Sequence, residues 1–569
     1  MNRAGGAVIA LLFLGPALPA AERMPAPSDG VAWAARDLAA LQVKAKSKSA
    51  KQFATIRYLW LGMEPAEDRI ADWKIASLQM NMLSRRAART RLYVVPDTNW
   101  SLLRLDLEDY GIRPEIWDLM GIYDPVFFFP VNKEEVVYIE KQVPRKGNKK
   151  KKRPLLVPKR IPVKSVKRYQ TVAPWLAPTG QSPLGKVEHI NLFGSIQTTT
   201  NSAAPIVSLS WFFYQTATAE NRDDEHPGYY QFLGIRTQKD FERIIGHHDD
   251  RKRGFMEYLA AVKNSGVARQ PRRVRRDRGR YWRTFDNTIA VDRFLRVKGK
   301  DVIERRNPLR TLNDEVEVFR FDATEAYGPL PNDLWVMGLW NEGGELQTFV
   351  PGLVGHDRLS RTNNGRIQVP ASCMRCHRYG GLQDVNCFVR QTISTRGNIQ
   401  DLGLQSPDKY LAGLLRDQYQ RSLDVPLASD RRWYELALWE LTEWKPARAA
   451  ALYGRSWTDW AERPVSLLRA SQEMGCSVEL LRDRLQKYAR ATGGVDTVLA
   501  ALFDPDVTRA NIPRDQWGEV YALCQFVVGG SVPLDFSYPA GYRHGSFLKK
   551  RAYKTKPFKS ILHHDGGER

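Results

Sequence analysis

The chain has 569 residues, of which 43% are hydrophobic and 11% aromatic, and its formal net charge is +23. This length suits three or four domains, and the composition is that of an ordinary globular protein. Such a chain can bury a large core, so its fold does not need disulfide bonds for its stability.

The first 21 residues have the pattern of an export signal. Arg3 supplies a positive start, residues 7–14 form a short apolar run, and Ala20 and Ala21 suit cleavage near residues 20–21. No later segment reaches about 18 unbroken apolar residues, the length that a membrane-spanning helix needs. We therefore expect the mature chain to be periplasmic or otherwise exported, without a transmembrane segment.

Residues 31–125 predict an N-terminal α+β domain. The apolar face of a helix is marked by four residues at 4-3-4 spacing, which are Ala71, Ile75, Leu78 and Met82. Residues 92–95 and 102–107 predict strands, and residues 112–120 predict a short helix.

Residues 126–200 combine strands with a basic insertion. Residues 126–129 and 136–139 are strand-like runs. Residues 141–168 hold thirteen lysines and arginines and no acid, and several prolines, which predicts a mobile loop. Nucleic acid is disfavoured as its partner because an exported protein rarely meets it, so a solvated insertion without a partner, or contact with an anionic envelope polymer, is the better hypothesis.

Residues 201–404 predict a central α+β domain. Residues 206–215 are apolar enough for a buried helix. Thr237 and Asp240 form a capping box for a helix that ends near Gly246, with His247 and His248 at an exposed helix end.

The strongest strand signal lies between residues 314 and 350. Residues 334–340 and 346–350 flank a Gly-rich connection at 341–344, which predicts a hairpin. The hairpin leads directly toward the motif on which the functional interpretation depends.

That motif is Cys373-Met374-Arg375-Cys376-His377. Two cysteines three apart, followed at once by histidine, have the spacing for covalent attachment of a c-type haem. We expect one haem c, with a thioether bond from each of Cys373 and Cys376 and with His377 as the proximal iron ligand. A thioredoxin-like pair lacks its βαβ surroundings, and a zinc site lacks further ligands nearby. Ser372 is a candidate N-cap for the helix that carries the motif.

Residues 405–530 predict a helical domain, followed by a basic tail at 531–569. Two helices of this domain each show an apolar face, one marked by Tyr434, Ala437, Leu438 and Leu441 and the other by Leu481, Leu485 and Tyr488. In an oxidising compartment Cys476 and Cys524 are candidates for a disulfide, which leaves Cys387 as the odd thiol, although other pairings stay open.

Taken in order, the motifs resemble those of the large exported cytochrome c-domain proteins abundant in planctomycete-like bacteria. The resemblance covers most of residues 55–530 and rests on Arg57-Tyr58-Leu59, Leu105-Asp106-Leu107-Glu108-Asp109-Tyr110, Trp117, Trp211-Phe212, Tyr229-Tyr230, Leu233-Gly234-Ile235, Asn264-Ser265-Gly266-Val267, Tyr281-Trp282-Arg283-Thr284-Phe285-Asp286, Leu330-Pro331-Asn332 and Ser372-Cys373-Met374-Arg375-Cys376-His377. It implies a haem c protein of the envelope. The chain departs from the family in lacking a histidine at residues 322–325 and in carrying the insertion at 141–168.

The sixth position of the iron decides between two functions. Residues 378–473 contain neither methionine nor histidine, so the candidate ligands are His356, Met337 and Met474, and an open position is the expected state. Single-electron transfer with an envelope redox partner is the leading function. The alternative is a peroxidase-like or other small-molecule haem enzyme, for which Arg375, Arg378, Tyr379 or His356 would supply a polar distal residue.

Overall fold

The computed structural model describes residues 25, 27–45, 50–118, 120, 122–145, 148–172, 187–202, 204–217, 228–247, 260–262, 267–273, 280–285, 293–297, 300–305, 318–319, 323–341, 343–350, 367–378, 424–461, 464–473 and 478–492, and single positions at 502, 512, 513, 517 and 524. Helices and sheets alternate along the chain, which confirms an α+β protein. The predicted export signal and the basic tail lie outside the described residues. No described helix has the length and apolarity to cross a membrane.

The first sheet has the strand order β2-β3-β1-β6. Its strands are β1 (Ile56–Trp60), β2 (Tyr93–Val94), β3 (Leu102–Asp106) and β6 (Ile206–Ser208). Strand β1 is buried along its whole length and pairs antiparallel with β3 and parallel with β6. Because β6 belongs to this sheet, the sheet draws a strand from the region that we assigned to a central domain.

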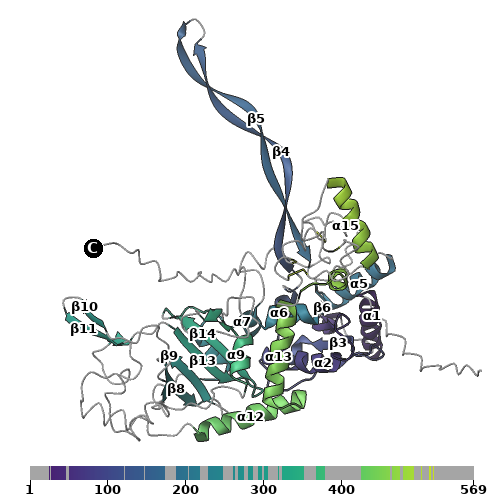
Figure 1. Ribbon diagram of the computed structural model, residues 1–569, viewed down its shortest axis with the longest axis vertical. Helices are drawn as coiled ribbons and strands as arrows, with labels where there is room; N and C mark the ends of the chain where they lie inside the picture. The colour runs from purple at the N-terminus through teal and green to yellow at the C-terminus, as the bar shows by residue number, and fades with distance from the viewer. Residues whose placement is uncertain are drawn as a thin grey trace, which may run out of the picture.

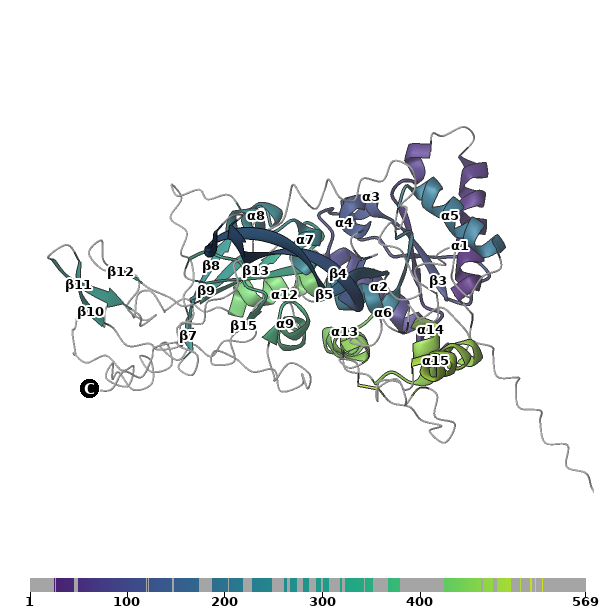
Figure 2. The same cartoon turned by 90° about the horizontal axis from the view of Figure 1, so that it is seen from above.

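The second sheet has the order β14-β13-β9-β8-β7. Its strands are β7 (Ala260–Val262), β8 (Val267–Arg273), β9 (Arg280–Phe285), β13 (Ala323–Pro329) and β14 (Trp335–Asn341). Two smaller sheets are formed by β10 (Arg293–Val297), β11 (Lys300–Arg305) and β12 (Val318–Phe319), and by β15 (Phe349–Val350) and β16 (Ile367–Gln368). Figures 1 and 2 show the two main sheets side by side.

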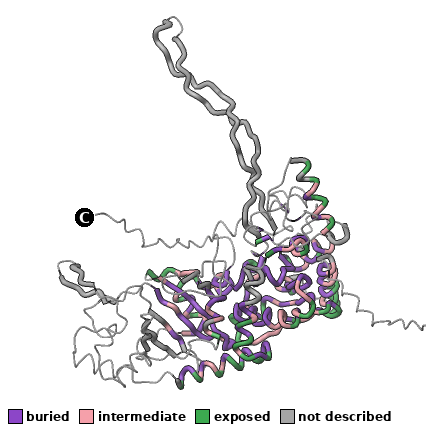
Figure 3. The backbone as a smooth tube through the Cα atoms, viewed as in Figure 1, coloured by how far each residue is buried: buried purple, intermediate pink, exposed green. Residues whose placement is uncertain are grey.

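The helices in the first half of the chain are α1 (Pro27–Lys44), the 3₁₀ helix η1 (Ala50–Phe53), α2 (Arg69–Met82), α3 (Leu107–Tyr110), α4 (Pro114–Asp118), α5 (Val187–Thr200), α6 (Leu209–Thr216), α7 (Tyr229–Leu233) and α8 (Gln238–Ile244). The longest of them are α1, α2 and α5. The second half holds α9 (Ala371–Cys376), α12 (Asp424–Thr442), α13 (Pro446–Ala461), α14 (Leu467–Glu473) and α15 (Val478–Thr492). Buried residues line β1, β3 and β6 of the first sheet, β13 and β14 of the second, and parts of the helices against them (Figure 3).

Several predicted elements are confirmed. Helix α2 buries Ile75, Leu78 and Met82, and α12 buries all four residues of its predicted face. The capping box is present, because the Thr237 hydroxyl accepts from the Asp240 amide and the Asp240 carboxylate accepts from the Thr237 amide. His247 is half-buried rather than exposed, with its ring centroid 5.0 Å from that of Tyr281. His248 and the side chain of Tyr488 lie outside the described residues.

The mobile loop predicted for residues 141–168 is wrong. Strands β4 (Ile122–Arg145) and β5 (Asn148–Val172) pair antiparallel and form a ribbon that projects from the body (Figure 1). Proline is a loop signal in the sequence. In the continuous part of the β4–β5 ladder, however, all five prolines lie in pairs of even-numbered residues, which are Pro130–Val166, Pro144–Lys152, Gln142–Pro154, Tyr138–Pro158 and Glu134–Pro162. Proline is tolerated in a strand where its missing N–H would point away from the paired strand. Antiparallel pairs alternate between hydrogen-bonded and non-hydrogen-bonded, so all five prolines fit if the even-numbered pairs are the non-hydrogen-bonded ones.

Three smaller expectations also need correction. The buried helix predicted at 206–215 begins only with α6, because its first three residues form β6. The Gly-rich turn at 341–344 forms, but the returning chain makes only a bridge at Leu346, and β15 then pairs with β16. Strand β13, the main partner of β14, was not predicted at all.

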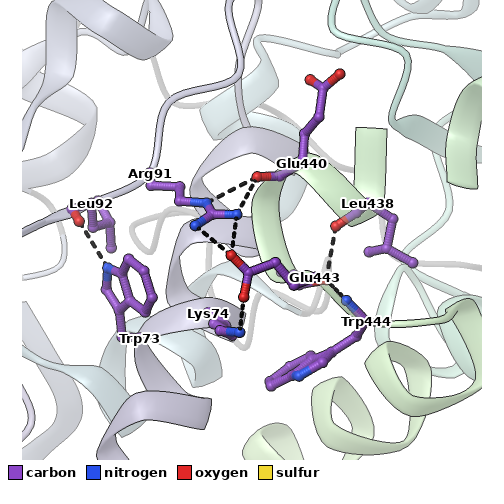
Figure 4. Close-up of polar contacts among 9 residues, drawn as sticks. Trp73, Lys74, Arg91, Leu92, Leu438, Glu440, Glu443 and Trp444 are labelled. Atoms are coloured by element: carbon purple, nitrogen blue, oxygen red, sulfur yellow. Dashed lines mark hydrogen bonds and ion pairs between the residues drawn. The ribbon is translucent and has the colours of Figure 1, made fainter. Parts of the chain in front are cut away.

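The C-terminal helices pack against the N-terminal part of the chain. Glu443, after the end of α12, accepts hydrogen bonds from Lys74 of α2 at 2.7 Å and from Arg91 at 3.1 Å (Figure 4). Arg91 also donates to the Glu440 carbonyl oxygen at 2.6 Å. These contacts fix α12, and with it α13, beside α2.

A buried ionic cluster fastens α14 in the same way. Arg469 donates to Glu473 at 2.9 Å and to the Ser210 hydroxyl at 2.6 Å, and forms an ion pair with Glu64 at 3.4 Å. Trp517 donates its indole N–H to Glu473 at 2.8 Å. Every guanidinium nitrogen of Arg469 has a partner, so this cluster is structural.

Candidate functional site

Helix α9 carries the CxxCH motif and is fixed at both ends. It follows the cis peptide bond Val369–Pro370, and the Ala371 amide donates to the Ala217 carbonyl at 3.1 Å. The His377 amide closes the helix by donating to the Cys373 carbonyl at 2.7 Å. The N-cap predicted at Ser372 is wrong: Pro370 holds that position, and Ser372 lies inside the helix, where its hydroxyl accepts from Arg375 at 3.4 Å.

The helix sets the motif residues within about one turn of one another. Cys373 lies three positions before Cys376 and four before His377, the spacings at which helical residues are neighbours. Cys373 and His377 are half-buried, and the side chain of Cys376 lies outside the described part of the chain. The helix thus sets the two cysteine positions one turn apart, with the histidine directly after the second.

The His377 imidazole faces the second sheet. Its Nε2 lies 3.2 Å from the hydroxyl of Tyr327 in β13, and the two ring centroids are 4.6 Å apart. The Tyr327 hydroxyl donates to the Glu325 carboxylate on the same strand. Because a phenol has a single proton, the imidazole then donates at Nε2. His377, Tyr327 and Glu325 therefore form one hydrogen-bonded row.

The same sheet face carries Met337. In the register of β13 and β14, Met337 lies directly opposite Tyr327, and directly opposite residues of an antiparallel pair share a face. Both side chains are 2% exposed. The Met337 amide donates to the Tyr229 hydroxyl at 3.4 Å, which ties β14 to α7. A methionine thioether thus lies on the sheet face that the imidazole approaches.

Three buried tyrosines of α7 and α13 lie close enough to Cys373 to be affected by its charge. Burial raises the pKa of Tyr229, Tyr230 and Tyr453, and the charge of a thiolate at Cys373 raises each of these pKa values further. The Glu325 carboxylate also raises the pKa of Tyr230. All three phenols therefore stay neutral near pH 7. Cys373 is itself half-buried beside these aromatic side chains of α7 and α13.

Helix α13 closes over α9 at a glycine. A Cβ atom at Gly454 would lie 2.8 Å from Cδ of Arg375, so a side chain there would force the arginine to move. The neighbouring Tyr453 donates to Gln79 of α2 at 2.6 Å, and its ring meets Phe213 edge-on. The motif helix is thus held by the same C-terminal helix that docks on α2.

No protein-family model matches the chain, and neither a curated protein nor a solved structure matches it. A function for this chain is therefore inferred from the residues of the site.

The structure brings some of the predicted residues together and leaves others outside the described ranges. Cys373, His377, Met337 and Arg375 gather around α9, and Arg378 is exposed beside it. The residues that lie outside are His356, Tyr379, Cys387, Met474 and Cys476. Cys524 is buried, and the disulfide proposed for it stays a prediction.

Sequence reasoning missed Tyr327 and Glu325. They lie about fifty positions before the motif, in the strand that was not predicted, and only the fold brings them to His377. Among the described residues no group of three or more His, Cys, Asp or Glu could hold a metal ion. A cavity of about 580 Å³ lies instead beside Trp33, Glu67 and Asp97 in the N-terminal part.

Proposed function

We propose that the protein is an exported c-type cytochrome that carries one haem c and transfers single electrons in the cell envelope. Cys373 and Cys376 would hold the haem through thioether bonds, and His377 would bind the iron. The observation that carries the proposal is α9, which sets the two cysteine positions one turn apart and ends at the histidine. When bound, the haem iron supplies one-electron oxidation and reduction.

The residues present fit this group in chemistry and in spacing. Two thiol positions and one imidazole on a single helix are the donor set of haem c. The half-exposure of Cys373 and His377 leaves them accessible for attachment. Nε2 is the atom of His377 that would bind iron, and it now meets the Tyr327 hydroxyl. Loading therefore requires the imidazole to give up that hydrogen bond.

The residues on the sheet face opposite the His377 imidazole bear on which group would occupy the sixth coordination position of the haem iron. Tyr327 and Met337 lie on this face, and the buried tyrosines close the neighbouring side. Met337 would favour a simple electron carrier, because a methionine ligand raises the potential of a haem. An open position remains our expectation, since Met337 packs in the core of β14 and its strand is held to α7 through Tyr229.

A haem enzyme is the second candidate, and the Tyr327–Glu325 pair is the observation that favours it. Peroxidase-like chemistry needs a polar residue across from the proximal histidine, and Tyr327 is a hydroxyl already bonded to a carboxylate. This residue replaces Arg375 as the best distal candidate, because Arg375 lies against α13 and Ser372.

Export, the resemblance to envelope cytochrome c-domain proteins and the finer domain division belong to the same proposal. The compartment follows from the export pattern at residues 1–21, and bacterial haem c is attached outside the cytoplasm. The two sheets and the C-terminal helices would then serve as the scaffold and docking surface around one haem.

Visible and near-infrared spectra of the purified protein, produced with a haem-attachment system, test the proposal. We expect the bands of haem c in the reduced form, a largely five-coordinate or water-bound ferric iron, and rapid binding of carbon monoxide. A near-infrared methionine-to-iron band would assign Met337 or Met474 as ligand and remove the enzyme candidate. A protein without haem absorption would contradict the proposal altogether.

A further inference from the structure

The β4–β5 ribbon takes no part in the proposed haem site and is built unlike the rest of the molecule. Its strands have 24 and 25 residues, and the ladder from Phe127–Tyr169 to Pro144–Lys152 is continuous. Within the described part of the chain, the ribbon projects from the body as a sheet of two strands (Figure 1). A two-stranded ribbon is only marginally stable in water, so a further strand beside it would stabilise it.

The prolines make the two edges of the ribbon different. Because all five occupy even-numbered pairs, these pairs are the ones without cross-strand hydrogen bonds, and even-numbered residues turn their N–H and C=O groups outward. On β5 the outward N–H is missing at Pro154, Pro158 and Pro162, which closes that edge to another strand. On β4, residues 131–143 contain no proline. Only the β4 edge can accept a further strand.

We propose that the β4 edge pairs with β4 of a second copy of this chain, antiparallel about a two-fold axis at Tyr138. In this register residue numbers of a pair sum to twice 138, so Glu135 lies opposite Lys141 of the second copy, and the pair occurs twice. Opposite charges at directly opposed positions stabilise a sheet. The outward-facing even residues then bond to each other, as an antiparallel ladder requires.

Charge selects this register and this partner. A two-fold axis one residue earlier, at Val137, would set Glu134 opposite Glu140 and Lys133 opposite Lys141, two repulsive pairs. The antiparallel arrangement also places the two basic tips, around residues 149–153, at opposite ends of the four-stranded sheet. A polyanion is the other conceivable occupant, but the β4 edge carries both signs of charge and the excess of lysine lies at the tip and on β5.

Sedimentation velocity of the mature full-length protein over a wide range of concentration tests the proposal. We expect reversible dimerisation. Val136→Pro removes an outward N–H that bonds the second copy while sparing the β4–β5 ladder, and should weaken the dimer about tenfold or more. Leu156→Pro is the matched control, because it removes an outward N–H from the closed β5 edge and should leave the dimer unchanged.

A charge swap provides a test that does not depend on proline. Glu135→Lys should weaken the dimer and Lys141→Glu should do the same, whereas the double variant should restore it. A wild-type protein that stays monomeric at every concentration overturns the proposal, as does equal weakening by Val136→Pro and Leu156→Pro. Association that appears only after addition of dextran sulfate would show polyanion bridging and overturn it too.

Discussion

Helix α9 and the β4–β5 ribbon are the two parts of the chain with the most distinctive sequences, and the fold treats them in opposite ways. Helix α9 packs against α13 and β16 and is approached by tyrosines of α7 and β13. Among the described elements, β4 and β5 make extensive contact only with each other. Helix α9 is therefore held in place by several neighbouring elements, whereas β4 and β5 are held mainly by their pairing with each other.

The difference shows where precise chemistry can be built. A group that must hold iron or a substrate within a fraction of an ångström needs neighbours that fix its rotamer, and His377 and Cys373 have them on several sides. A ribbon held on one side only can present charge or an open edge, for which position along the strand matters more than side-chain geometry. Substitutions at both places should therefore differ in what they change.

The largest effect is expected at Tyr453, which connects α13 to α2 behind the motif helix. Tyr453→Ala should lower the free energy of unfolding by about 3–5 kcal/mol, because it empties a buried aromatic site. Tyr453→Phe, which loses only the hydrogen bond to Gln79, should cost about 1–2 kcal/mol. Urea unfolding measures both. A loss below 1 kcal/mol for Tyr453→Ala would show that α9 is not supported from this side.

A smaller and more specific effect is expected at Tyr327. In the haem-loaded protein, Tyr327→Phe should weaken cyanide binding to ferric iron about five- to tenfold, because the variant lacks the hydroxyl whose proton would turn from Glu325 to the bound anion. Stability and haem content should change little. Tyr281→Phe is the matched control, since Tyr281 is also buried and bonded to a glutamate but lies away from His377. Equal cyanide affinity in both variants would remove Tyr327 from the distal side.

The smallest effect on folding is expected from the ribbon. Deletion of residues 130–166, with a short Gly-Ser connection between the paired residues Phe129 and Lys167, should change the free energy of unfolding of the monomer by less than about 1 kcal/mol, since the ribbon makes little contact with the body. Urea unfolding at low protein concentration avoids any contribution from self-association. A cost of several kcal/mol would mean that the ribbon belongs to the folded core and that the contrast is false.

The sequence predicts the parts of this molecule that have a local cause. The helical periodicity of α2 and α12, the capping box at Thr237 and the CxxCH spacing each depend on residues within one or two turns of one another. For the same reason the motif residues themselves could be named. The α+β class follows from the mixture of periodic patterns, although the place of β6 in the first sheet does not.

The remaining features have causes that lie far apart in the chain. Tyr327 contacts His377 because β13 lies between β14 and β9 in the second sheet. The sequence of residues 323–329 does not predict this strand, because glycine and proline weaken the strand signal there. The sequence does not predict the ribbon, because proline indicates a loop when the pairing of its strand is unknown. Its compatibility with a strand depends on the parity of the pairing, which appears only when the register with residues 130–144 is known.

Acid–acetone extraction of the wild-type protein and of the Cys373→Ala/Cys376→Ala variant tests the central claim most directly. Thioether bonds keep haem in the precipitated protein, whereas a haem held by iron ligation alone passes into the solvent. We expect the wild-type haem to stay with the protein and the double variant to release any haem that it retains. Haem that remains covalently bound in the double variant, or a wild-type protein that never acquires haem, would contradict the account.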